Sequence, residues 1–327
     1  MSKNMEPSKT LVVVLNWNSR EMTAECIRSL LAMDSQDFRI LVIDNGSRDG
    51  SVEYLRVKFP QIGVISNGRN LGFAAGCNGG IRHALNERAE FVLLVNNDTV
   101  VDPAMLQELL NTAVQEPEAA MVSPKIFYFD PRDRLWWAGG LYNLWRGIPR
   151  HVGFREKDGS EYNRPRELEW ATGCVMLLRC QALSQVGLFD ERIFGNGEDL
   201  DLSLRVRERG WRILYAPRAK VWHKEGIDYR RNVGEYARTF TAVRNLLWIM
   251  HKHARPAQWL TFLPQFTLEY VPKMVLRSLL RRDFRSARAV FGGIAAYFQM
   301  CRNPAALALP EDLVRTTLPA SMESLSK

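Results

Sequence analysis

The sequence has few cysteines and no pattern that pairs them. The five cysteines are odd in number, lie far apart and form no CxxC pair: Cys26, Cys77, Cys174, Cys180 and Cys301. A set of this kind does not predict a disulfide framework. It is typical of a protein kept in a reducing cytosol, so we expect a cytoplasmic protein.

Long apolar runs are also absent from the sequence. Residues 1–10 are polar and contain no apolar core of the sort found in signal peptides. The longest uncharged runs towards the C-terminus, residues 256–268 and 289–301, are 13 residues each. A transmembrane helix needs about 20 apolar residues, so none is expected.

Negative charge is scarce in the last third of the chain. Residues 226–327 hold 15 of the 44 Lys and Arg residues but only 7 of the 36 Asp and Glu residues, so residues 1–225 hold 29 of each. The whole net charge of +8 therefore comes from the tail. This asymmetry favours a tail that contacts an anionic partner, either a membrane surface or nucleic acid. A solvated basic helical surface is the alternative.

Short apolar runs, most of them rich in β-branched residues, alternate with amphipathic stretches over the first third of the chain. We expect buried strands at 11–15, 39–44, 62–66 and 91–95, and helices at 21–33, 51–59, 78–88 and after Pro103. This alternation predicts an α/β domain with a doubly wound, mostly parallel central sheet. The carboxyl ends of its strands should gather at one edge, where ligands of such sheets bind.

The rest of the chain divides into an irregular middle and a helical end. Residues 121–170 are rich in aromatic residues, Gly and Pro and predict only strand-like pieces. The elements expected after them are a loop and buried strand at 171–179, helices at 180–187 and 198–210, two short strands around a turn at Pro217, and helices at 235–253 and after Pro256. We therefore predict an α/β domain over residues 1–225 and a basic helical region over residues 226–327.

Three polar residues follow the expected strand at 91–95. They are Asn96, Asn97 and Asp98, and the stretch reads FVLLVNNDTVVDP. A carboxylate that follows a buried strand costs free energy unless it is paired. A divalent cation, held together with phosphate oxygens of a ligand, is a natural partner for Asp98. The alternative is an Asx turn that only reverses the chain.

Two glycine-containing loops follow other expected strands. NGSRDGS comes directly after Asp44, whose carboxylate can accept hydrogen bonds from a nucleoside; a plain turn is the alternative. NLGFAAGCNGG, residues 70–80, offers the close backbone approach and the N–H groups of a helix start that a ligand needs. It has neither the Lys-Ser/Thr ending of a P-loop nor a G-x-G-x-x-G motif, which argues against an ATPase and a dehydrogenase.

Acidic residues begin the expected helix at 198–210. Glu198, Asp199 and Asp201 suit the positive end of a helix dipole, and that is their structural alternative. Glu198 and Asp199 also follow the stretch FGNG, and a carboxylate on such a rim can act as a general base. His223 ends the stretch AKVWH. A single histidine is more often structural, but with Asp98 it would complete a metal site.

Taken in their order along the chain, these motifs resemble those of the family 2 glycosyltransferases, in particular of their rhamnosyltransferase-like branch. The resemblance covers residues 10–225 and rests on VVVLNWNS, VIDNGSRDGS, NLGFAAGCNGG, LLVNNDTVVDP, WATGCVMLLR, VGLFDERIFGNGEDLDLSLRVRERGWRILYAP and VWH. One position departs from the family, whose metal motif is often Asp-x-Asp, because this chain has Asn96-Asn97-Asp98. Asp98 is then left to hold the metal with His223.

The resemblance implies a glycosyltransferase A-type fold that binds a nucleotide sugar, with a C-terminal helical extension. Asp199 would be the catalytic base, and Asp98 and His223 would hold Mg²⁺ or Mn²⁺. Asp44 would lie near the base of the nucleoside. The other expected contacts are Asn16, Asn45, Asn70, Gly72 and Asn97 on the donor side, and Trp170, Thr172, Gly173 and Glu198 on the acceptor side.

The resemblance further implies an inverting, metal-dependent glycosyltransferase. The expected donor carries a deoxyhexose, such as L-rhamnose in dTDP-rhamnose, and the expected acceptor is a saccharide or lipid-linked saccharide of a cell-surface polysaccharide. One alternative is a UDP-hexose or UDP-galactofuranose donor. Another, suggested by the reduced acidic motif, is a non-catalytic protein that binds nucleotide sugars.

The basic tail would suit an enzyme whose acceptor is lipid-linked. Arg277, Arg281, Arg285 and Arg288 recur at three and four residues, which predicts one basic face of an amphipathic helix. Such a helix favours peripheral docking at the inner face of the cell membrane. The tail has no nucleic-acid-binding motif, so nucleic acid is not an expected partner. The alternatives are helices that pack on the α/β domain and the interface of a homo-oligomer.

Overall fold

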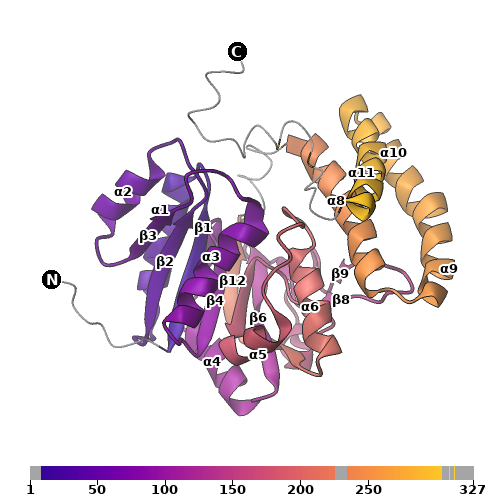
Figure 1. The fold of residues 1–327 in the computed structure, drawn as a ribbon. Coiled ribbons are helices and arrows are strands. Elements are labelled where there is room, and N and C mark those ends of the chain that lie inside the picture. The colour runs from indigo at the N-terminus through magenta and orange to yellow at the C-terminus, as the bar shows by residue number, and fades with distance from the viewer. Residues whose placement is uncertain (1–8, 225–233, 304–308, 310–312, 314–327) are drawn as a thin grey trace.

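The computed structural model describes residues 9–224 and 234–303, together with residues 309 and 313. A large sheet with helices on both faces forms one side of the molecule, and a group of helices lies beside it (Figure 1). The first part of the chain forms β1 (Thr10–Asn16), α1 (Arg20–Leu31), β2 (Phe38–Asp44), α2 (Ser51–Lys58), β3 (Gly63–Ser66), α3 (Gly72–Asn86), β4 (Phe91–Asn96), β5 (Thr99–Val101) and α4 (Met105–Gln115). The strands and helices expected here are confirmed, and β5 is an addition.

The middle of the chain is more regular than its composition predicts. It forms β6 (Ala119–Tyr128), β7 (Leu135–Trp137), β8 (Gly140–Leu141), β9 (Arg150–His151), the short helix η1 (Ser160–Tyr162), β10 (Arg166–Glu167), β11 (Val175–Arg179), α5 (Cys180–Val186), α6 (Glu198–Glu208) and β12 (Arg212–His223). The two strands expected around Pro217 are one strand, β12. The expectation was wrong because Pro217 falls at an irregularity in the pairing of β12 with β6, where a missing N–H is tolerated.

The central sheet is mixed. Its strand order is β10-β12-β6-β11-β4-β1-β2-β3, with β5 paired to β12 and β7 paired to β6. β4, β1, β2 and β3 run parallel to one another. β11 runs antiparallel between β4 and β6, and β12 is again parallel to β6. The expected α/β fold is confirmed, with its parallel pairs in the N-terminal half and between β6 and β12.

Burial on both faces explains the apolar sequences of β1 and β4. Residues 11–14 and 91–95 are each at most 3% exposed. Each aliphatic side chain buried in this way stabilises the fold by roughly 1.5–3 kcal/mol. The strands end together, since Asn16 pairs with Asp44 and Leu15 pairs with Asn96. The core therefore fixes the polar residues that follow the strands at one edge of the sheet.

The glycine-rich stretch NLGFAAGCNGG belongs mainly to a helix. It was expected as a loop leading to a helix at residue 78, but α3 begins at Gly72. A Cβ on Gly80 would lie 2.3 Å from a methyl group of Val13, and one on Gly76 would lie 2.5 Å from a methyl group of Leu15. These two glycines therefore allow α3 to pack closely against β1, and close packing explains their place in the sequence.

Four helices follow the gap in the described residues, and the first of them packs on the α/β part. They are α8 (Gly234–His253), α9 (Pro256–Gln265), α10 (Val271–Leu280) and α11 (Phe284–Arg302), with the π-helical turn η2 (Phe266–Tyr270) between α9 and α10. α8 lies between α6 and the outer helices (Figure 1). A second hydrophobic core joins Ile193, Leu200 and Trp170 to Leu246 and Ile249 of α8. The boundary predicted between residues 225 and 226 falls within residues 225–233, outside the described residues.

The four arginines predicted to share one helical face are divided between α10, α11 and the turn that joins them. Arg277 lies in α10, whereas Arg285 and Arg288 lie in α11. The prediction of one continuous helical face was wrong because the chain turns between these helices, where Arg282 has a φ of 59° and the Asp283 carboxylate accepts the Ser286 N–H at the start of α11. None of the helices in the described ranges is long and apolar enough to cross a membrane.

A buried acidic residue ties α6 to α8. Asp201 is fully buried, and its carboxylate lies 3.0 Å from Arg205 Nε, 2.5 Å from Lys252 Nζ and 2.9 Å from His253 Nε2. Burial alone would raise the pKa of Asp201. The hydrogen bond from His253 and the charges of Lys252 and Arg205 outweigh burial and lower the pKa below its ordinary value. This network joins the tail to the α/β part.

Replacing Asp201 with Asn should lower the free energy of unfolding by about 3 kcal/mol at neutral pH, because Lys252, Arg205 and the His253 imidazole all lose a buried carboxylate. Because the pKa of Asp201 is lower in the folded protein than the value of about 3.9 in the unfolded chain, its carboxylate stabilises the fold at pH values above about 3.9. That contribution is lost as the pH falls through the folded-state pKa. The deficit of Asp201→Asn should therefore shrink in acid. Urea unfolding of wild type and variant, at neutral pH and in acid, measures this difference in the free energy of unfolding. Glu269→Gln, which breaks an exposed pair with Lys273, is the control. Equal effects of the two variants would contradict the assignment.

Candidate active site

Strand pairing brings Asp98 and His223 together although 125 positions separate them in the sequence. β5 pairs antiparallel with the end of β12, so that Thr99 lies opposite His223. The Lys224 N–H also donates to the Asp98 carbonyl at 2.9 Å. As a result, Asp98 Oδ1 lies 3.1 Å from His223 Nε2, and both side chains are less than a tenth exposed. The structure confirms that these two residues meet.

The Asp98 carboxylate favours a positive charge on His223, and burial opposes it. Burial alone would lower the pKa of His223, but the Asp98 carboxylate outweighs it and raises the pKa well above 6.5. Burial also raises the pKa of the neighbouring Cys174 thiol, which therefore keeps its proton at neutral pH. The Asp98 carboxylate therefore favours the protonated form of His223. A divalent cation bound there would replace the proton.

An antiparallel strand carries Thr172 and Gly173 to the same edge of the sheet. β11 begins where β4 ends, and the Asn96 N–H donates to the Cys174 carbonyl at 2.8 Å. The loop before β11 is held by its own side chain, since the Cys174 N–H donates to Thr172 Oγ1. The residues expected on the acceptor side, Thr172 and Gly173, therefore lie near Asp98.

Asp199 lies in the first turn of α6 and is fixed by two backbone donors. Its Oδ2 accepts the Gly173 N–H at 2.8 Å, and its Oδ1 accepts the Leu200 N–H at 2.8 Å. Gly197, which precedes the helix, has a φ of 105° that favours glycine. A Cβ on Gly197 would also come within 2.9 Å of Ile249 in α8. The start of α6 is thus held between the loop at Gly173 and α8.

Glu198 is buried and Asp199 half-buried, and their carboxyl groups are neighbours at the start of α6. Burial and the charge of Asp199 raise the pKa of Glu198 to about 8. Burial also raises the pKa of Asp199, although the N–H groups of Gly173 and Leu200 oppose the shift. Among the described residues, Glu198 Oε2 has no hydrogen-bond partner. Of the two, Asp199 is the better candidate for a carboxylate at neutral pH, and its raised pKa makes it a stronger base than an exposed aspartate.

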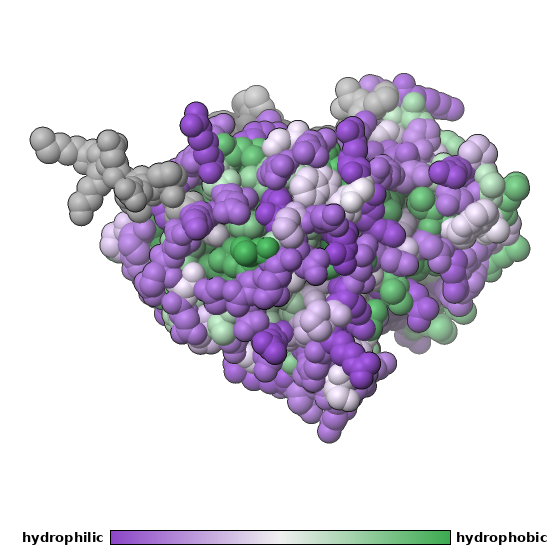
Figure 2. Space-filling view, turned by 90° about the horizontal axis from the view of Figure 1, so that it is seen from below, coloured by the Kyte–Doolittle hydropathy of each residue, from purple (hydrophilic) through white to green (hydrophobic). Residues whose placement is uncertain are grey.

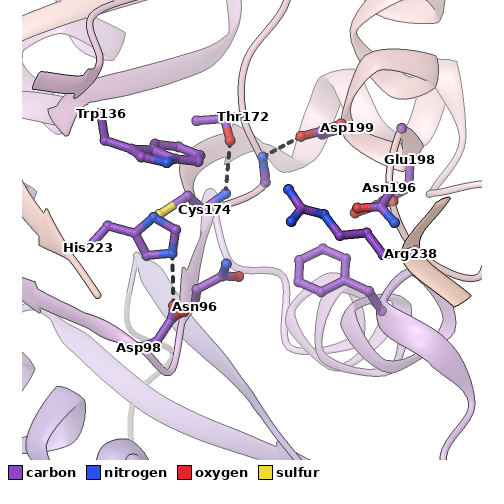
Figure 3. A pocket seen from close by; sticks show the side chains of 14 residues that line it. Asn96, Asp98, Trp136, Thr172, Cys174, Asn196, Glu198, Asp199, His223 and Arg238 are labelled. Atoms are coloured by element: carbon purple, nitrogen blue, oxygen red, sulfur yellow. Dashed lines mark hydrogen bonds and ion pairs between the residues drawn. The ribbon is translucent and has the colours of Figure 1, made fainter. Parts of the chain in front are cut away.

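These groups line one cavity of about 280 Å³ at the edge of the sheet (Figure 3). The Asp98–His223 pair lies on one side of it, and Glu198 and Asp199 lie on the other (Figure 3). The lining residues come from the ends of β4 and β12, from β7, from the loop before β11, from α6 and the loop before it, and from α3 and α8: Phe73, Asn96, Asp98, Trp136, Thr172, Gly173, Cys174, Gly195, Asn196, Gly197, Glu198, Asp199, His223 and Arg238. Acidic, amide and cationic groups therefore face one space that a ligand can enter.

α8 contributes both a wall and a clamp to this cavity. The guanidinium of Arg238 points into the cavity (Figure 3). Deeper in α8, the buried Asn245 amide donates to the carbonyls of Gly195 and Asn196 at 2.6 and 2.8 Å. Asn196 itself donates to Thr241 Oγ1 at 3.0 Å. The loop that precedes Asp199 is therefore held by α8, a helix that the sequence assigned to the tail.

The other residues expected on the donor side lie outside this cavity and bond to one another. The Asp44 carboxylate is fully buried and accepts from Asn16 Nδ2 and from the N–H groups of Gly46 and Ser47. Thr23 Oγ1 donates to Asn16 Oδ1 at 2.6 Å and accepts from Asn97 Nδ2 at 3.0 Å. This network joins the ends of β1, β2 and β4.

Asn45 holds the segment that leads into α3. Its amide donates to Asn70 Oδ1 at 2.9 Å and to the Gly72 carbonyl at 3.0 Å. Its oxygen accepts the Leu71 N–H at 3.2 Å. Trp170, expected on the acceptor side, is buried in the second hydrophobic core. The donor-side roles and that of Trp170 stay predictions.

The family of the chain follows from its sequence as well as its geometry. The model of the family described as "Glycosyl transferase family 2" matches residues 11–187, more than half of the chain. The chain belongs to this family. It is therefore a glycosyltransferase, and its mixed sheet with flanking helices is the glycosyltransferase A-type fold.

Known relatives of this glycosyltransferase include two mycobacterial enzymes. An N-acetylglucosaminyl-diphospho-decaprenol L-rhamnosyltransferase of Mycobacterium tuberculosis is 26% identical over 300 residues, which cover 84% of this chain and 95% of that protein. The galactofuranosyltransferase GlfT1 of Mycolicibacterium smegmatis is 27% identical over 218 residues, which cover 66% of this chain and 71% of that protein. The first of these confirms the resemblance to rhamnosyltransferases.

Among solved structures, a mannosyltransferase from Pyrobaculum calidifontis in complex with GDP-Man and Mn²⁺ has the same fold. It superposes with a TM-score of 0.54 at 16% identity and covers 97% of this chain and 86% of that chain. At this identity the likeness concerns the fold alone.

The glycosyltransferase site includes residues that sequence reasoning missed or assigned differently. Asn96, for which the sequence predicted no contact with a substrate, lines the cavity, whereas Asn97, expected on the donor side, bonds to Thr23. Arg238 and Asn245 were missed because they lie in the basic tail, where arginine and asparagine are ordinary residues. Their spacing in α8 carries no motif. Only the packing of α8 on the loop before α6 gives them a role.

Replacing Asn245 with Ala should lower kcat by about tenfold or more and change the KM for the donor less. The loop of Gly195 and Asn196 would lose two hydrogen bonds, and small shifts of a reacting group cost large factors in rate. Steady-state kinetics measure kcat and the KM for the donor, and a thermal melt shows whether the variant is folded. Thr239→Ala, a truncation on the same helix, is the control. An unchanged kcat in a folded Asn245→Ala protein would contradict the positioning role.

Proposed function

We propose that this protein is an inverting, metal-dependent glycosyltransferase that moves a deoxyhexose, L-rhamnose from dTDP-rhamnose, to a lipid-linked saccharide. The observation that carries the proposal is the cavity in which Asp199 faces the Asp98–His223 pair (Figure 3). One side supplies ligands for a cation beside a diphosphate. The other side supplies a base for the acceptor hydroxyl.

Asp98 and His223 fit a divalent cation by their chemistry. They present a carboxylate oxygen and an imidazole nitrogen 3.1 Å apart. Within the described ranges, no cluster of three or more His, Cys, Asp or Glu side chains could hold a metal. Mn²⁺ and Mg²⁺ are commonly held by one or two side chains together with phosphate oxygens of the substrate, so a two-residue set suffices. When bound, the cation would stabilise the negative charge of the leaving nucleoside diphosphate.

Asp199 is the proposed general base. A free oxygen lone pair of its carboxylate takes the proton of the acceptor hydroxyl as that oxygen bonds to the anomeric carbon of the donor sugar. The bond from the anomeric carbon to the diphosphate oxygen breaks in the same step, and its electron pair leaves with the nucleoside diphosphate. Attack from the side opposite the leaving group inverts the anomeric carbon. A positioned base of this kind contributes about 10²–10⁴-fold to the rate.

Arg238 gives this acidic cavity a cation from the tail. Its closest ion-pair partner that we observe is Glu235 of its own helix, at 3.7 Å. A guanidinium is suited to phosphate oxygens because its N–H groups form a planar fork. We infer that Arg238 contacts a phosphate of the bound substrates.

The identity of the donor and the acceptor is inferred from relatives. The mycobacterial rhamnosyltransferase supports L-rhamnose as the sugar and a lipid-linked saccharide as the acceptor. The galactofuranosyltransferase favours UDP-galactofuranose as a second candidate donor. A lipid-linked acceptor also supports a cytoplasmic enzyme that works at the inner face of the membrane.

Replacing Asp199 with Asn should leave donor binding intact and lower transfer by about 10²-fold or more, because the amide cannot accept the proton. In the wild-type enzyme kcat should fall on the acid side as Asp199 becomes protonated. That limb should lie above the ordinary aspartate pKa because burial raises the pKa of Asp199. Calorimetry measures donor binding, and product formation measures transfer. Near wild-type transfer by Asp199→Asn would remove Asp199 as the base.

A donor panel tests the proposed activity itself. The purified chain with Mn²⁺ should release nucleoside diphosphate from dTDP-rhamnose faster than from UDP-hexoses or UDP-galactofuranose. Faster release from UDP-galactofuranose would select the second candidate donor. Failure with every donor, with or without metal, would favour a non-catalytic binding protein.

A further inference from the structure

The outer helices of the tail expose many large apolar side chains. Of the 16 exposed large hydrophobic residues in the described part of the chain, nine fall between positions 260 and 298. We call these nine residues the apolar face: Leu260, Leu263, Leu268, Leu276, Leu279, Leu280, Phe284, Phe291 and Phe298. Figure 2 shows hydrophobic residues gathered at the right-hand edge of the molecule, the side on which α9 to α11 lie in Figure 1. Such a concentration marks an interaction surface.

The spacing of these residues places them on the outer sides of their helices. Phe284, Phe291 and Phe298 recur every seven residues in α11 and are 65%, 58% and 57% exposed. The opposite side of α11 is buried, with Val290 and Gly293 facing inwards. α10 has no fully buried residue at all. α11 therefore packs on α8, α10 packs on α11, and both helices still present apolar side chains to the outside.

Basic residues outnumber acidic ones in the helices that carry the apolar face, and we call these basic residues the basic rim. Residues 256–302 contain seven Lys and Arg residues and only two acidic residues. Both acidic residues are engaged locally, because Asp283 caps α11 and Glu269 pairs with Lys273 at 2.8 Å. Arg288 follows Phe284 by one turn of the same helix and is exposed. The surface therefore combines exposed Leu and Phe side chains with unbalanced basic charge.

We propose that the apolar face and its basic rim dock on an anionic lipid bilayer. Exposed Phe and Leu side chains enter the boundary between head groups and acyl chains, while Arg and Lys contact anionic head groups. A second copy of the chain fits less well. A two-fold interface would bring the same basic rim of both copies together, and like charges in contact oppose association.

The position of this surface relative to the cavity suits a lipid-linked acceptor. α11 packs against α8 through Gly293, on which a Cβ would lie 2.6 Å from the Phe240 carbonyl. α8 in turn carries Arg238 into the cavity. Docking would thus hold the cavity close to the membrane where a lipid-linked acceptor lies. This benefit rests on the proposed function, whereas the docking itself does not.

Vesicle flotation of the full chain tests the docking. The vesicles are phosphatidylcholine alone or phosphatidylcholine with about 30% phosphatidylglycerol, at about 0.15 M salt. The wild-type protein should bind the anionic vesicles and not the neutral ones. The triple variant F284S/F291S/F298S and the triple variant R277Q/R281Q/R288Q should each bind at least about tenfold more weakly. The control V57S/V114S removes two exposed valines from α2 and α4 and should bind as wild type does.

Several outcomes would overturn the docking. They are failure of the wild-type chain to bind anionic vesicles, equal binding by the phenylalanine variant and the valine control, and a lipid-free dimer that the phenylalanine substitutions abolish. Donor hydrolysis is measured on the same samples and should be equal in all of them, since the substituted residues lie outside the cavity. If the wild-type chain hydrolyses the donor but does not bind anionic vesicles, only the docking is refuted. If the wild-type chain binds anionic vesicles but does not hydrolyse any donor, only the proposed reaction is refuted.

Discussion

The pairing of β12 with β5 is the interaction on which the candidate site depends. It sets His223 opposite Thr99 and so brings the imidazole to the carboxylate of Asp98. β12 can reach this position because it also runs parallel to β6, and because the pairing tolerates an irregularity at Pro217. The antiparallel β11 then delivers Gly173 to the same edge, where its N–H fixes Asp199. The mixed sheet therefore brings the proposed base and the proposed cation ligands together around one cavity.

The tail is a structural part of this glycosyltransferase site. The charge network of Asp201, the amide of Asn245 and the guanidinium of Arg238 all connect α8 to residues that line or support the cavity. One side of the helical group thus completes the site, while its outer side carries the apolar face. Membrane contact and catalysis are proposed for two sides of the same four helices. The tail can therefore pack on the α/β part and contact a membrane at the same time.

The sequence predicts the strands of the sheet and the polar residues at their ends better than it predicts how the helices pack around them. Apolar runs such as residues 91–95 identify the strands, and the polar residues after them mark the edge of the sheet. The role of Gly76 and Gly80 could not be predicted, since glycines that face a ligand and glycines that face a strand look alike in sequence. The parts played by Asn245 and Arg238 depend on how α8 packs, which no local pattern encodes. The break between Arg277 and Arg285 depends on a single turn.

The central claim is that Asp98 and His223 together hold a divalent cation beside the donor diphosphate. Crystals of the full chain grown with dTDP and Mn²⁺ test it most directly, through the anomalous scattering of manganese. The account predicts one strong peak within bonding distance of Asp98 Oδ and His223 Nε2, at about 2.0–2.2 Å, and in contact with the diphosphate. A peak elsewhere in the cavity, or a bound diphosphate with no metal at Asp98 while Mn²⁺ supports transfer, would contradict it.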